Sequence, residues 1–490
     1  MKKTFLLLLL TVFVFILTVT LLGCSEMLTT EDPDTTESTA ESTTENTTEA
    51  TTEAPLPTVG NPSIVGYKTT EPITLPNFYI NTDGNVAITS RDTYVGAGVT
   101  ISNTLNDEVF GMTDRRIEVR CRGNFTYTSA TMQKKSYRLK FEEKVNLFAQ
   151  GKGASKSWVL LANHCDKTLL RNHLAFTLGS LLTNIDYCSS SSFVHLYVND
   201  KYMGIYQLAE QHNANESRIN ITEDPDVIDT DYLIERDYYA MNEGKEGKDY
   251  FLVGKKSYNI KTDYPDSLLA EKKCEFLRQY FQKAYDAILS GKQADVEKYI
   301  DLPSMVDTFI LQAMTKNIDV GWSSFFMVKK AGDKIYFTCP WDFDLAFGND
   351  SRLDNGGAVG LYTGDKSYMM QEHEWFYLLM NNKWFCNLVR ARWNAVSRKL
   401  YNALNNEIDR FASCFADEFP KNFDRWRVFA TKINQEPSAI LKLSSWDANV
   451  TNLKSWIKDR YEYLDKLIRY SDLYKQGGQI GDEWWLEWTS

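Results

Sequence analysis

The stretch that most constrains the fold of this 490-residue chain is residues 301–349, DLPSMVDTFILQAMTKNIDVGWSSFFMVKKAGDKIYFTCPWDFDLAFGN. Apolar residues at helical spacing follow Asp301 and Pro303, which suit the start of a helix, and the pattern ends near Lys316. FFMVK and KIYFTC then predict two strands joined by the turn AGD. This order of elements leaves a short polar loop on each side of the hairpin.

Acidic residues occupy both of these loops. Asp319 precedes the hairpin, and Asp342 and Asp344 follow it. Most loop aspartates cap helices or close turns, so a structural role for all three is one interpretation. The other is catalytic, because protein kinases use a similar order of elements to bring a catalytic Asp and a metal-binding Asp to one phosphoryl group. Paired carboxylates could also serve a glycosidase, and the 13% aromatic content suits sugar binding.

The N-terminal residues predict export. Lys2 and Lys3 are followed by the apolar run FLLLLLTVFVFILTVTLL and then by Gly23 and Cys24. LLGC matches the bacterial lipobox, so residues 1–23 are predicted to be a lipoprotein signal peptide and Cys24 the lipidated anchor. An uncleaved membrane anchor is the alternative, since about 20 apolar residues can span a bilayer. Either interpretation places the rest of the chain outside the bacterial cytoplasmic membrane.

Composition then divides the rest of the chain. Residues 24–66 are predicted to form a disordered Thr/Glu-rich tether, because TTESTAESTTENTTEATTEAP offers almost no apolar surface to bury. We expect the folded domain over residues 67–475 and a Trp-rich tail at 476–490. The cysteines after Cys24 are scattered without a CxxC pair, so we expect buried thiols. The net charge of −11 predicts no nucleic-acid partner.

Strand and helix patterns divide the folded part into two halves. Short strand patterns dominate from about residue 67 to 265, including RRIEVRCRGN, SYRLKFEE, WVLLA and a predicted hairpin of FVHLYV and MGIYQLAE. A helix is predicted near residues 167–183, with Asp166 as its cap. Long helical patterns dominate from about 266 to 475. We therefore predict an α+β protein with a β-rich N-terminal half and a mainly helical C-terminal half.

Basic residues alternate along two of the predicted strands, in RCRGN (120–124) and in KKSYRLK (134–140). Such alternation places several cations on one face of a sheet. The face could simply be solvated, or it could bind an anion such as a triphosphate. In the second interpretation, Lys140 or Arg122 would take the part of the strand-borne lysine of kinases.

Four blocks of sequence occur in an order that resembles the CotH family, the atypical kinases named for a spore-coat protein. The blocks are RCRGNFTYTSATMQKKSYRLKF, WVLLANHCDKTLLRN, VHLYVNDKYMGIYQLAE and CPWDFDLAFGN, within a resemblance that covers roughly residues 72–470. The resemblance implies a divergent protein-kinase-like fold of two lobes, ATP with Mg²⁺ or Mn²⁺ as cofactors, and phosphoryl transfer to Ser or Thr. The implied acceptors are exported or cell-surface proteins.

The resemblance also implies roles for residues. Asp319 becomes the catalytic acid, Asp342 the metal ligand and Asp344 its support. Ser324 lies five positions after Asp319, where ordinary kinases have a metal-binding Asn, and its hydroxyl is a weaker ligand. The predicted nucleotide-binding residues are Lys140, Arg122, Asn124 and Glu210, with Asp166 and Arg171 as further candidates. Because of Ser324 and the lack of a Gly-rich loop, the alternative is a catalytically weak pseudokinase that acts as a surface scaffold.

Overall fold

The computed structural model describes residues 74–104, 109–262, 269–352, 354–361 and 374–470. The chain divides into two units, Met1–Thr58 and Val59–Ser490, and every described residue belongs to the second. The predicted signal peptide, the anchor Cys24, the tether and the Trp-rich tail lie outside the described residues. Among the helices that are described, none combines the length and apolar character needed to cross a membrane.

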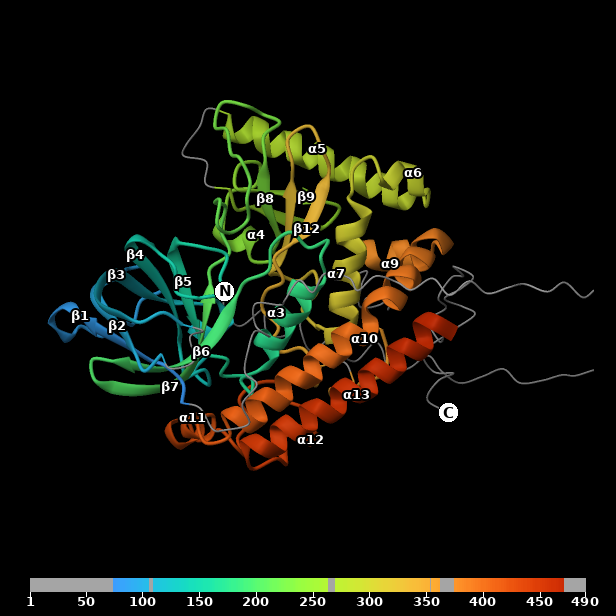
Figure 1. Cartoon of the computed structure of the whole chain (residues 1–490). Coiled ribbons are helices and arrows are strands. Elements are labelled where there is room, and N and C mark those ends of the chain that lie inside the picture. The colour runs from blue at the N-terminus through green and yellow to red at the C-terminus, as the bar shows by residue number, and fades with distance from the viewer. Residues whose placement is uncertain (1–73, 105–108, 263–268, 353, 362–373, 471–490) are drawn as a thin grey trace, which may run out of the picture. The chain divides into compact units, whose positions relative to one another are not determined.

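Seven strands in the first part of the chain close into a barrel, in the order β1-β2-β3-β4-β5-β7-β6 (Figure 1). Neighbouring strands are antiparallel except β1 and β6, which are parallel. The strands are β1 (Asn77–Thr82), β2 (Val95–Ser102), β3 (Met112–Arg122), β4 (Ser136–Val145), β5 (Ser155–Leu161), β6 (Ser191–Val198) and β7 (Lys201–Glu210).

Side chains alternate along each strand, so that apolar ones fill the barrel and the intervening ones lie on its outer surface. Val119, Leu139 and Trp158 point inward and are fully buried in one apolar cluster. The intervening residues of β3 and β4, which include the alternating basic residues, therefore face outward. The predicted hairpin of FVHLYV and MGIYQLAE is confirmed as β6 and β7, with Asn199 and Asp200 at positive φ in its turn.

A second sheet joins strands from both halves of the sequence, in the order β12-β11-β8-β10-β9. Its strands are β8 (Tyr232–Arg236), β9 (Tyr250–Val253), β10 (Lys256–Ile260), β11 (Phe325–Lys329) and β12 (Ile335–Thr338). The hairpin predicted for FFMVK and KIYFTC is confirmed as β11 and β12. β11 also pairs with β8, and Phe325 lies opposite Arg236. The helical half of the chain thus completes a sheet begun in the β-rich half.

Helices dominate the second half and surround this sheet. The four longest are α5 (Ala270–Leu289), α7 (Leu302–Thr315), α10 (Lys383–Cys414) and α13 (Trp446–Tyr470). The shorter ones are α2 (Phe125–Thr128), α3 (Arg171–Leu181), α4 (Ala240–Glu243), α6 (Gln293–Val296), α9 (Glu374–Met380), α11 (Pro420–Arg425), α12 (Ser438–Leu441) and the 3₁₀ turn η1 (Asp83–Asn85). The prediction of a mixed α+β protein is confirmed, and the closed barrel is an addition to it.

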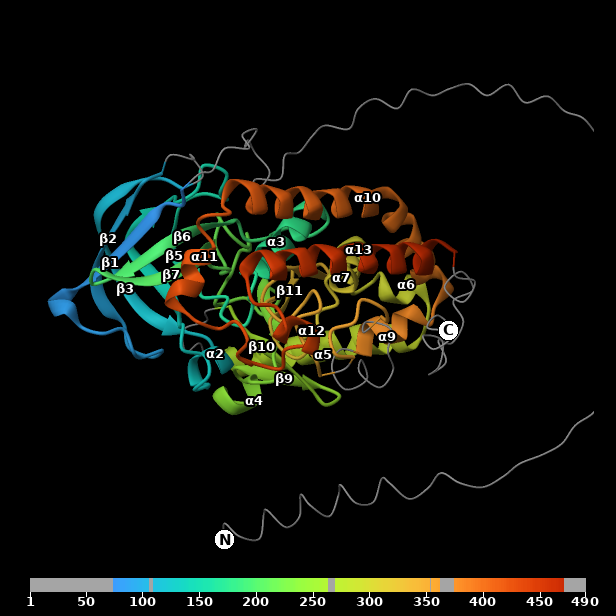
Figure 2. The ribbon, with the colours of Figure 1, turned by 90° about the horizontal axis from the view of Figure 1, so that it is seen from below.

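Helices α10 and α13 lie side by side (Figure 2) and run antiparallel. Tyr401 stacks on Tyr461 at 4.4 Å, and the Trp393 indole donates to Asp465 at 2.9 Å. Helix α3 is buried on nearly every side, so its sequence carries little amphipathic signal. It begins at Arg171, later than the predicted start near residue 167. All seven described cysteines are buried and free.

Candidate active site

Asp319 lies in the loop that follows α7. Asp301 caps this helix as predicted, accepting a hydrogen bond from the Ser304 backbone N–H at 2.8 Å, and the helix ends at Lys316 in the left-handed region. The Asp319 carboxylate is 34% exposed and accepts a hydrogen bond from Arg352 at 3.1 Å. Burial raises its pKa to about 6, and the nearby carboxylates add to this effect against the opposing charge of Arg352.

Asp342 and Asp344 lie in the loop that follows β12. Asp342 is exposed and has a φ of 66°, in the left-handed region that Asp adopts more readily than most other non-glycine residues. Between the two acids, the Phe343 side chain is buried and its backbone N–H donates to the Asn172 Oδ1 on α3 at 2.6 Å. The Asn349 Nδ2 donates to the Asp344 carbonyl oxygen at 2.7 Å. Amide side chains from two segments therefore hold this loop in place.

The acids on these two loops interact with one another electrostatically. Burial raises the pKa of Asp344 well above its usual value, and Asp342, Asp166 and Asp319 raise it further. Although Asp342 is exposed at the surface, partial desolvation by the protein around its carboxylate raises its pKa, and Arg122 and a hydrogen bond from the Ser324 side chain oppose the shift. The two loops together therefore form a region of negative potential in which a bound cation would stabilise the charged carboxylates.

The donor atoms at this region suit a hard divalent cation. Carboxylates, a hydroxyl and an amide oxygen are the kinds of ligand that Mg²⁺ and Mn²⁺ prefer, and Mg²⁺ usually takes only one or two protein carboxylates. Asn349 supports the fit, because its Oδ1 is buried beside this loop and has no hydrogen-bond partner among the described residues. The described residues contain no group of three or more His, Cys, Asp or Glu side chains placed to hold a metal. Water and substrate oxygens would have to complete the coordination.

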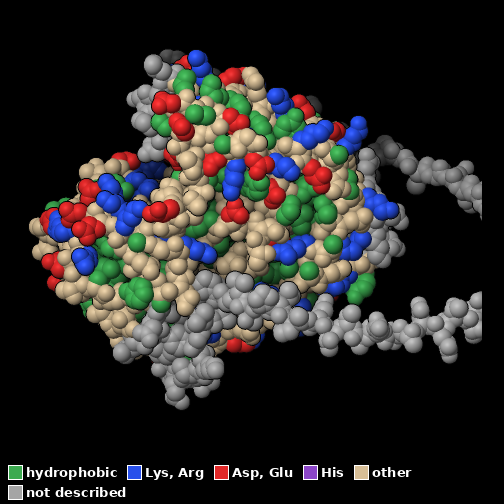
Figure 3. All heavy atoms as spheres, turned by 45° about the horizontal axis from the view of Figure 1, so that its top comes forward, with side chains coloured by type: hydrophobic (Ala, Val, Ile, Leu, Met, Phe, Trp, Pro, Cys, Tyr) green, Lys and Arg blue, Asp and Glu red, His purple; other side chains and the backbone are tan. Residues whose placement is uncertain are grey.

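A basic surface on the barrel faces Asp342. Arg122, at the end of β3, lies over the Trp341 ring at 5.4 Å, and Asp342 stabilises its charged form. Burial, with some repulsion from Arg120 and Arg138, nevertheless lowers the pKa of Arg122 to about 10. Arg120 and Arg138 are register partners on β3 and β4. Figure 3 shows a hollow between the barrel and the part that carries β8 and β9, with Lys or Arg side chains on its wall.

Two observations make this surface suitable for an anion. The Nε atoms of Arg120 and Arg138 are buried, and within the described ranges they have no hydrogen-bond partner. Buried donors without a partner cost free energy that an acceptor such as a phosphate oxygen would recover. The His212 ring packs against the Trp341 ring at 4.5 Å, and burial together with Arg122 and Lys261 lowers the pKa of His212 well below its usual value. A neutral His212 adds no further positive charge.

The second sheet supplies the connection between the two loops and the basic surface. Glu235 on β8 forms an ion pair with Lys261 at 3.1 Å and accepts a hydrogen bond from the Ser324 backbone N–H at 2.9 Å. Ser324 in turn reaches Asp342 through its side chain. Ser324 therefore belongs to the acidic cluster, and its backbone has a positive φ of 59°.

Comparison with known protein families identifies the family of the chain. Residues 119–464, more than half of the chain, match the family described as CotH kinase protein. The chain belongs to the CotH kinase family. No curated protein matches the chain significantly. The match to the CotH family begins within β3 and ends within α13, so it contains both acidic loops and the basic surface, but not β1 or β2.

Not all residues predicted from the resemblance to the CotH family come together. Asp319, Asp342, Asp344, Ser324 and Arg122 lie at the acidic cluster or directly beside it. Lys140 does not. It is opposite Glu118, with which it forms an ion pair at 3.1 Å, and it lies about 13 Å along the strands from the level of Arg122, given a rise of about 3.3 Å per residue.

The other predicted nucleotide contacts have structural partners. The Asn124 Oδ1 accepts a hydrogen bond from Arg91 at 2.8 Å on the surface. Glu210 is fully buried, pairs with Arg218 at 3.2 Å and accepts from the Ser190 backbone N–H at 2.9 Å. Because the Glu210 carboxylate is closed off from solvent, a nucleotide cannot reach it in this structure.

Asp166 and Arg171 form a buried ion pair below the loop of Asp344. The Asp166 Oδ2 also accepts from the Arg171 backbone N–H at 2.8 Å, so it caps α3 from five positions earlier in the sequence. Asp166 adds to the negative potential at Asp344, while Arg171 fixes the Asp166 carboxylate. Both residues therefore support the cluster from behind.

Four residues of this region were not predicted as site residues. Arg120 and Arg138 belong to the alternating basic strands, whose pattern indicated the face but not the end that meets the acids. Asn349 lies in the last predicted block, FGN, as an ordinary loop residue. Arg352, which bridges Asp319 and Asp350, comes from an irregular segment with no sequence pattern to mark it.

Proposed function

We propose that this chain transfers the γ-phosphoryl group of ATP to Ser or Thr hydroxyls of exported or cell-surface proteins. The supporting observation is the arrangement of a chain of the CotH kinase family in which Asp319 and the loop of Asp342 and Asp344 face an arginine-rich surface. Acids that attract a cation and arginines that attract phosphate oxygens are the two requirements of a nucleoside triphosphate site.

In the proposed reaction, the acceptor hydroxyl oxygen attacks the γ-phosphorus while its proton passes to the Asp319 carboxylate, and ADP leaves. A pKa of about 6 suits Asp319 to this role, because the group is mostly charged at neutral pH yet retains basicity. Arg352, which holds Asp319 at 3.1 Å, orients the carboxylate. Arg122, Arg120 and Arg138 would bind the phosphate oxygens.

Asp342, Asp344 and Ser324, with Asn349 behind them, would hold Mg²⁺ or Mn²⁺. When bound, the ion would supply charge neutralisation for the phosphate groups. The barrel with its basic surface and the helical part with both acidic loops would then act as the two lobes of a kinase-like fold. In this proposal the nucleotide lies between them.

Location and partners are also part of the proposal. Export through the signal at residues 1–23 and lipidation of Cys24 would place the folded part on the outer side of the bacterial cell membrane, among exported proteins. The tether would let it reach neighbouring surface proteins. Basic and acidic side chains are intermixed on the face shown in Figure 3, which agrees with a protein acceptor rather than a nucleic acid.

The test is transfer of label from γ-labelled ATP to the chain itself or to an exported protein fraction, with Mg²⁺ or Mn²⁺ present. The full chain is kept in detergent micelles. Asp342→Asn and Asp319→Asn should abolish transfer, while Asp286→Asn, on the exposed side of α5, should not. Absence of transfer by the unsubstituted chain, or equal transfer by Asp342→Asn, would refute the proposal.

A pseudokinase scaffold is the second candidate, and Ser324 favours it. The Ser324 hydroxyl is engaged with Asp342, and it replaces the amide that ordinary kinases use for a metal. Calorimetry separates the candidates: metal-dependent ATP binding without transfer supports the pseudokinase, and no nucleotide binding supports a scaffold alone.

A further inference from the structure

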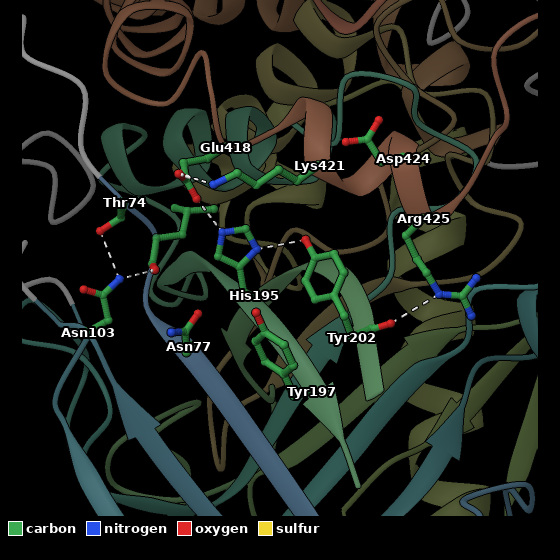
Figure 4. Close-up of a pocket in the computed structure, with 11 residues that line it drawn as sticks. Thr74, Asn77, Asn103, His195, Tyr197, Tyr202, Glu418, Lys421, Asp424 and Arg425 are labelled. Carbon is green, nitrogen blue, oxygen red and sulfur yellow. Dashed lines mark hydrogen bonds and ion pairs between the residues drawn. The ribbon is translucent and has the colours of Figure 1, made fainter. Parts of the chain in front are cut away.

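A polar cavity lies on the barrel, away from the acidic loops. It occupies about 480 Å³ where β1, β6 and β7 meet α11 and the segment before it (Figure 4). Among the described residues, its lining includes none of the acids or arginines of the candidate active site. The volume falls in the range of about 300–1,000 Å³ that is typical of small-molecule sites.

Aromatic rings form one wall of this cavity. Tyr197 on β6 and Tyr202 on β7 line the cavity, and Tyr79 on β1, outside the lining, supports Tyr197. The three residues are register partners in pairs. The rings of Tyr79 and Tyr197 stack at 4.8 Å, and those of Tyr197 and Tyr202 lie 5.2 Å apart. All three are half-buried and point outward, because their strand neighbours Phe78 and Leu196 fill the barrel. The barrel core therefore does not explain this row of tyrosines.

Hydrogen bonds fix the floor of the cavity. The His195 Nδ1 lies 2.9 Å from the Tyr202 hydroxyl, and its Nε2 lies 2.5 Å from Glu418. Lys421 pairs with Glu418 at 2.7 Å, and Arg425 donates through Nε to the Tyr202 carbonyl oxygen at 3.2 Å. These contacts tie the aromatic row to α11, so the wall is held in one arrangement before any ligand arrives.

Several polar groups around the cavity have hydrogen-bonding capacity to spare. Within the described ranges, no hydrogen bond is made by the Asn77 amide, the Asp424 carboxylate, the Tyr197 hydroxyl or the terminal nitrogens of Arg425. Together they offer both donors and acceptors. In Figure 4, Asn77 lies beside Tyr197, and Asp424 and Arg425 lie on the side of Tyr202.

The charge of the lining is balanced. Lys421 and Arg425 are matched by Glu418 and Asp424, and the Lys421 ammonium is already paired. A polyanion therefore finds no excess of positive charge here, and an apolar ligand would leave the polar groups unpaired. A ligand with hydroxyl groups around its edge and C–H groups on its face meets both conditions.

We propose that this cavity binds a neutral oligosaccharide. The sugar would lie with C–H groups across the solvent-facing parts of the Tyr197 and Tyr202 rings, while hydroxyls of the bound sugars exchange hydrogen bonds with Asn77, Asp424 and Arg425. The space holds roughly one or two sugar rings, so longer chains would extend into solvent. The inference is independent of phosphoryl transfer, since it uses none of the groups of the acidic cluster.

The test is isothermal titration of the full chain, in a detergent without sugar headgroups, against cellotetraose, chitotetraose and maltotetraose. At least one should bind, with a Kd below about 1 mM, which corresponds to about −4 kcal/mol. Tyr197→Ala should weaken that binding at least tenfold, and Asp424→Asn should weaken it about fivefold. Tyr336→Ala, which removes a half-buried strand tyrosine from β12, and Asp286→Asn are the matched controls and should change it less than twofold.

Three results would overturn the inference. They are no binding by any of the three sugars, binding that survives both Tyr197→Ala and Asp424→Asn, and preferential binding of polyphosphate that Lys421→Gln removes. Melting curves accompany each variant. If Tyr197→Ala does not fold, Asp424→Asn decides alone, because the Asp424 side chain is exposed and its replacement disturbs no core contact.

Discussion

Asn172 provides the sharpest test of how α3 holds the loop of Asp342 and Asp344. Its Oδ1 accepts from the Phe343 backbone N–H at 2.6 Å, and its Nδ2 donates to the Asn163 Oδ1 at 3.0 Å. All three residues are buried. Asn172→Ala removes both hydrogen bonds and leaves a buried donor and a buried acceptor to find other partners.

The expected cost follows from these two groups. Leaving one buried polar group unpaired costs about 1–3 kcal/mol, so two groups cost about 3 kcal/mol after partial rearrangement. Replacing Asn by Ala in a helix returns about 0.5 kcal/mol. We therefore expect the free energy of unfolding to fall by about 2–3 kcal/mol. Because the loop also carries Asp342 and Asp344, phosphoryl transfer should fall by more than tenfold under conditions in which the variant remains folded.

Urea unfolding followed by tryptophan fluorescence measures the first effect, and label transfer from ATP measures the second. Asn402→Ala is the control, because Asn402 is exposed on α10 and experiences the same change of helix propensity without the buried contacts. If the two variants unfold at the same urea concentration and transfer label equally, Asn172 does not hold the loop.

Three further predictions follow from the same structure. The pH profile of kcat/KM should rise about tenfold per pH unit below pH 6 and level off above it, because Asp319 must be deprotonated and its pKa is about 6; a flat profile from pH 5 to 8 would argue against Asp319 as the base. Arg122→Gln should weaken ATP binding at least tenfold in calorimetry while Lys140→Ala changes it less than twofold, and the reverse order would return the phosphate site to Lys140. His173→Ala should destabilise the fold by about 3 kcal/mol, since His173 pairs with the buried Glu407 at 2.6 Å. Burial alone would raise the Glu407 pKa, but Arg410 and His173 lower it to about 2. The charged Glu407 therefore stabilises the fold above pH 4.5, and this stabilisation is lost as the pH falls towards 2. The loss of stability over this pH range should be smaller in His173→Ala than in the unsubstituted chain.

The local elements were predictable because their signals are local. The Asp301 cap, the α7 helix and the β11–β12 hairpin all follow from patterns within a few residues, and the structure confirms each. Closure of the barrel was not predictable in this way. It depends on the parallel pairing of β1 with β6, between segments that no turn connects. The same holds for β11 beside β8.

The acidic residues of the candidate site were easier to predict from the sequence than its basic residues. Asp319 and Asp342 stand at the exits of a recognisable hairpin, whereas alternation along β3 and β4 leaves Arg122 and Lys140 equivalent until the position of Trp341 is known. Glu210 lies in a sequence block that suggested a site residue. Its burial against Arg218 is a tertiary contact, which the sequence did not show. Sequence patterns give the side of a strand that a residue faces; which end of that side meets a partner depends on the fold.

The pairing of β11 with β8 has a consequence for the order in which this protein folds. Most of the barrel forms from antiparallel neighbours along the chain, which require only short loops to close. The β11–β12 hairpin, by contrast, must pair with β8, and the loop after β12 must contact α3. Both partners lie far earlier in the sequence, so these contacts close long loops and should form later. Refolding should therefore restore the barrel before it restores ATP binding. A chain in which only the barrel has folded would have its arginines in place while still unable to bind a nucleotide.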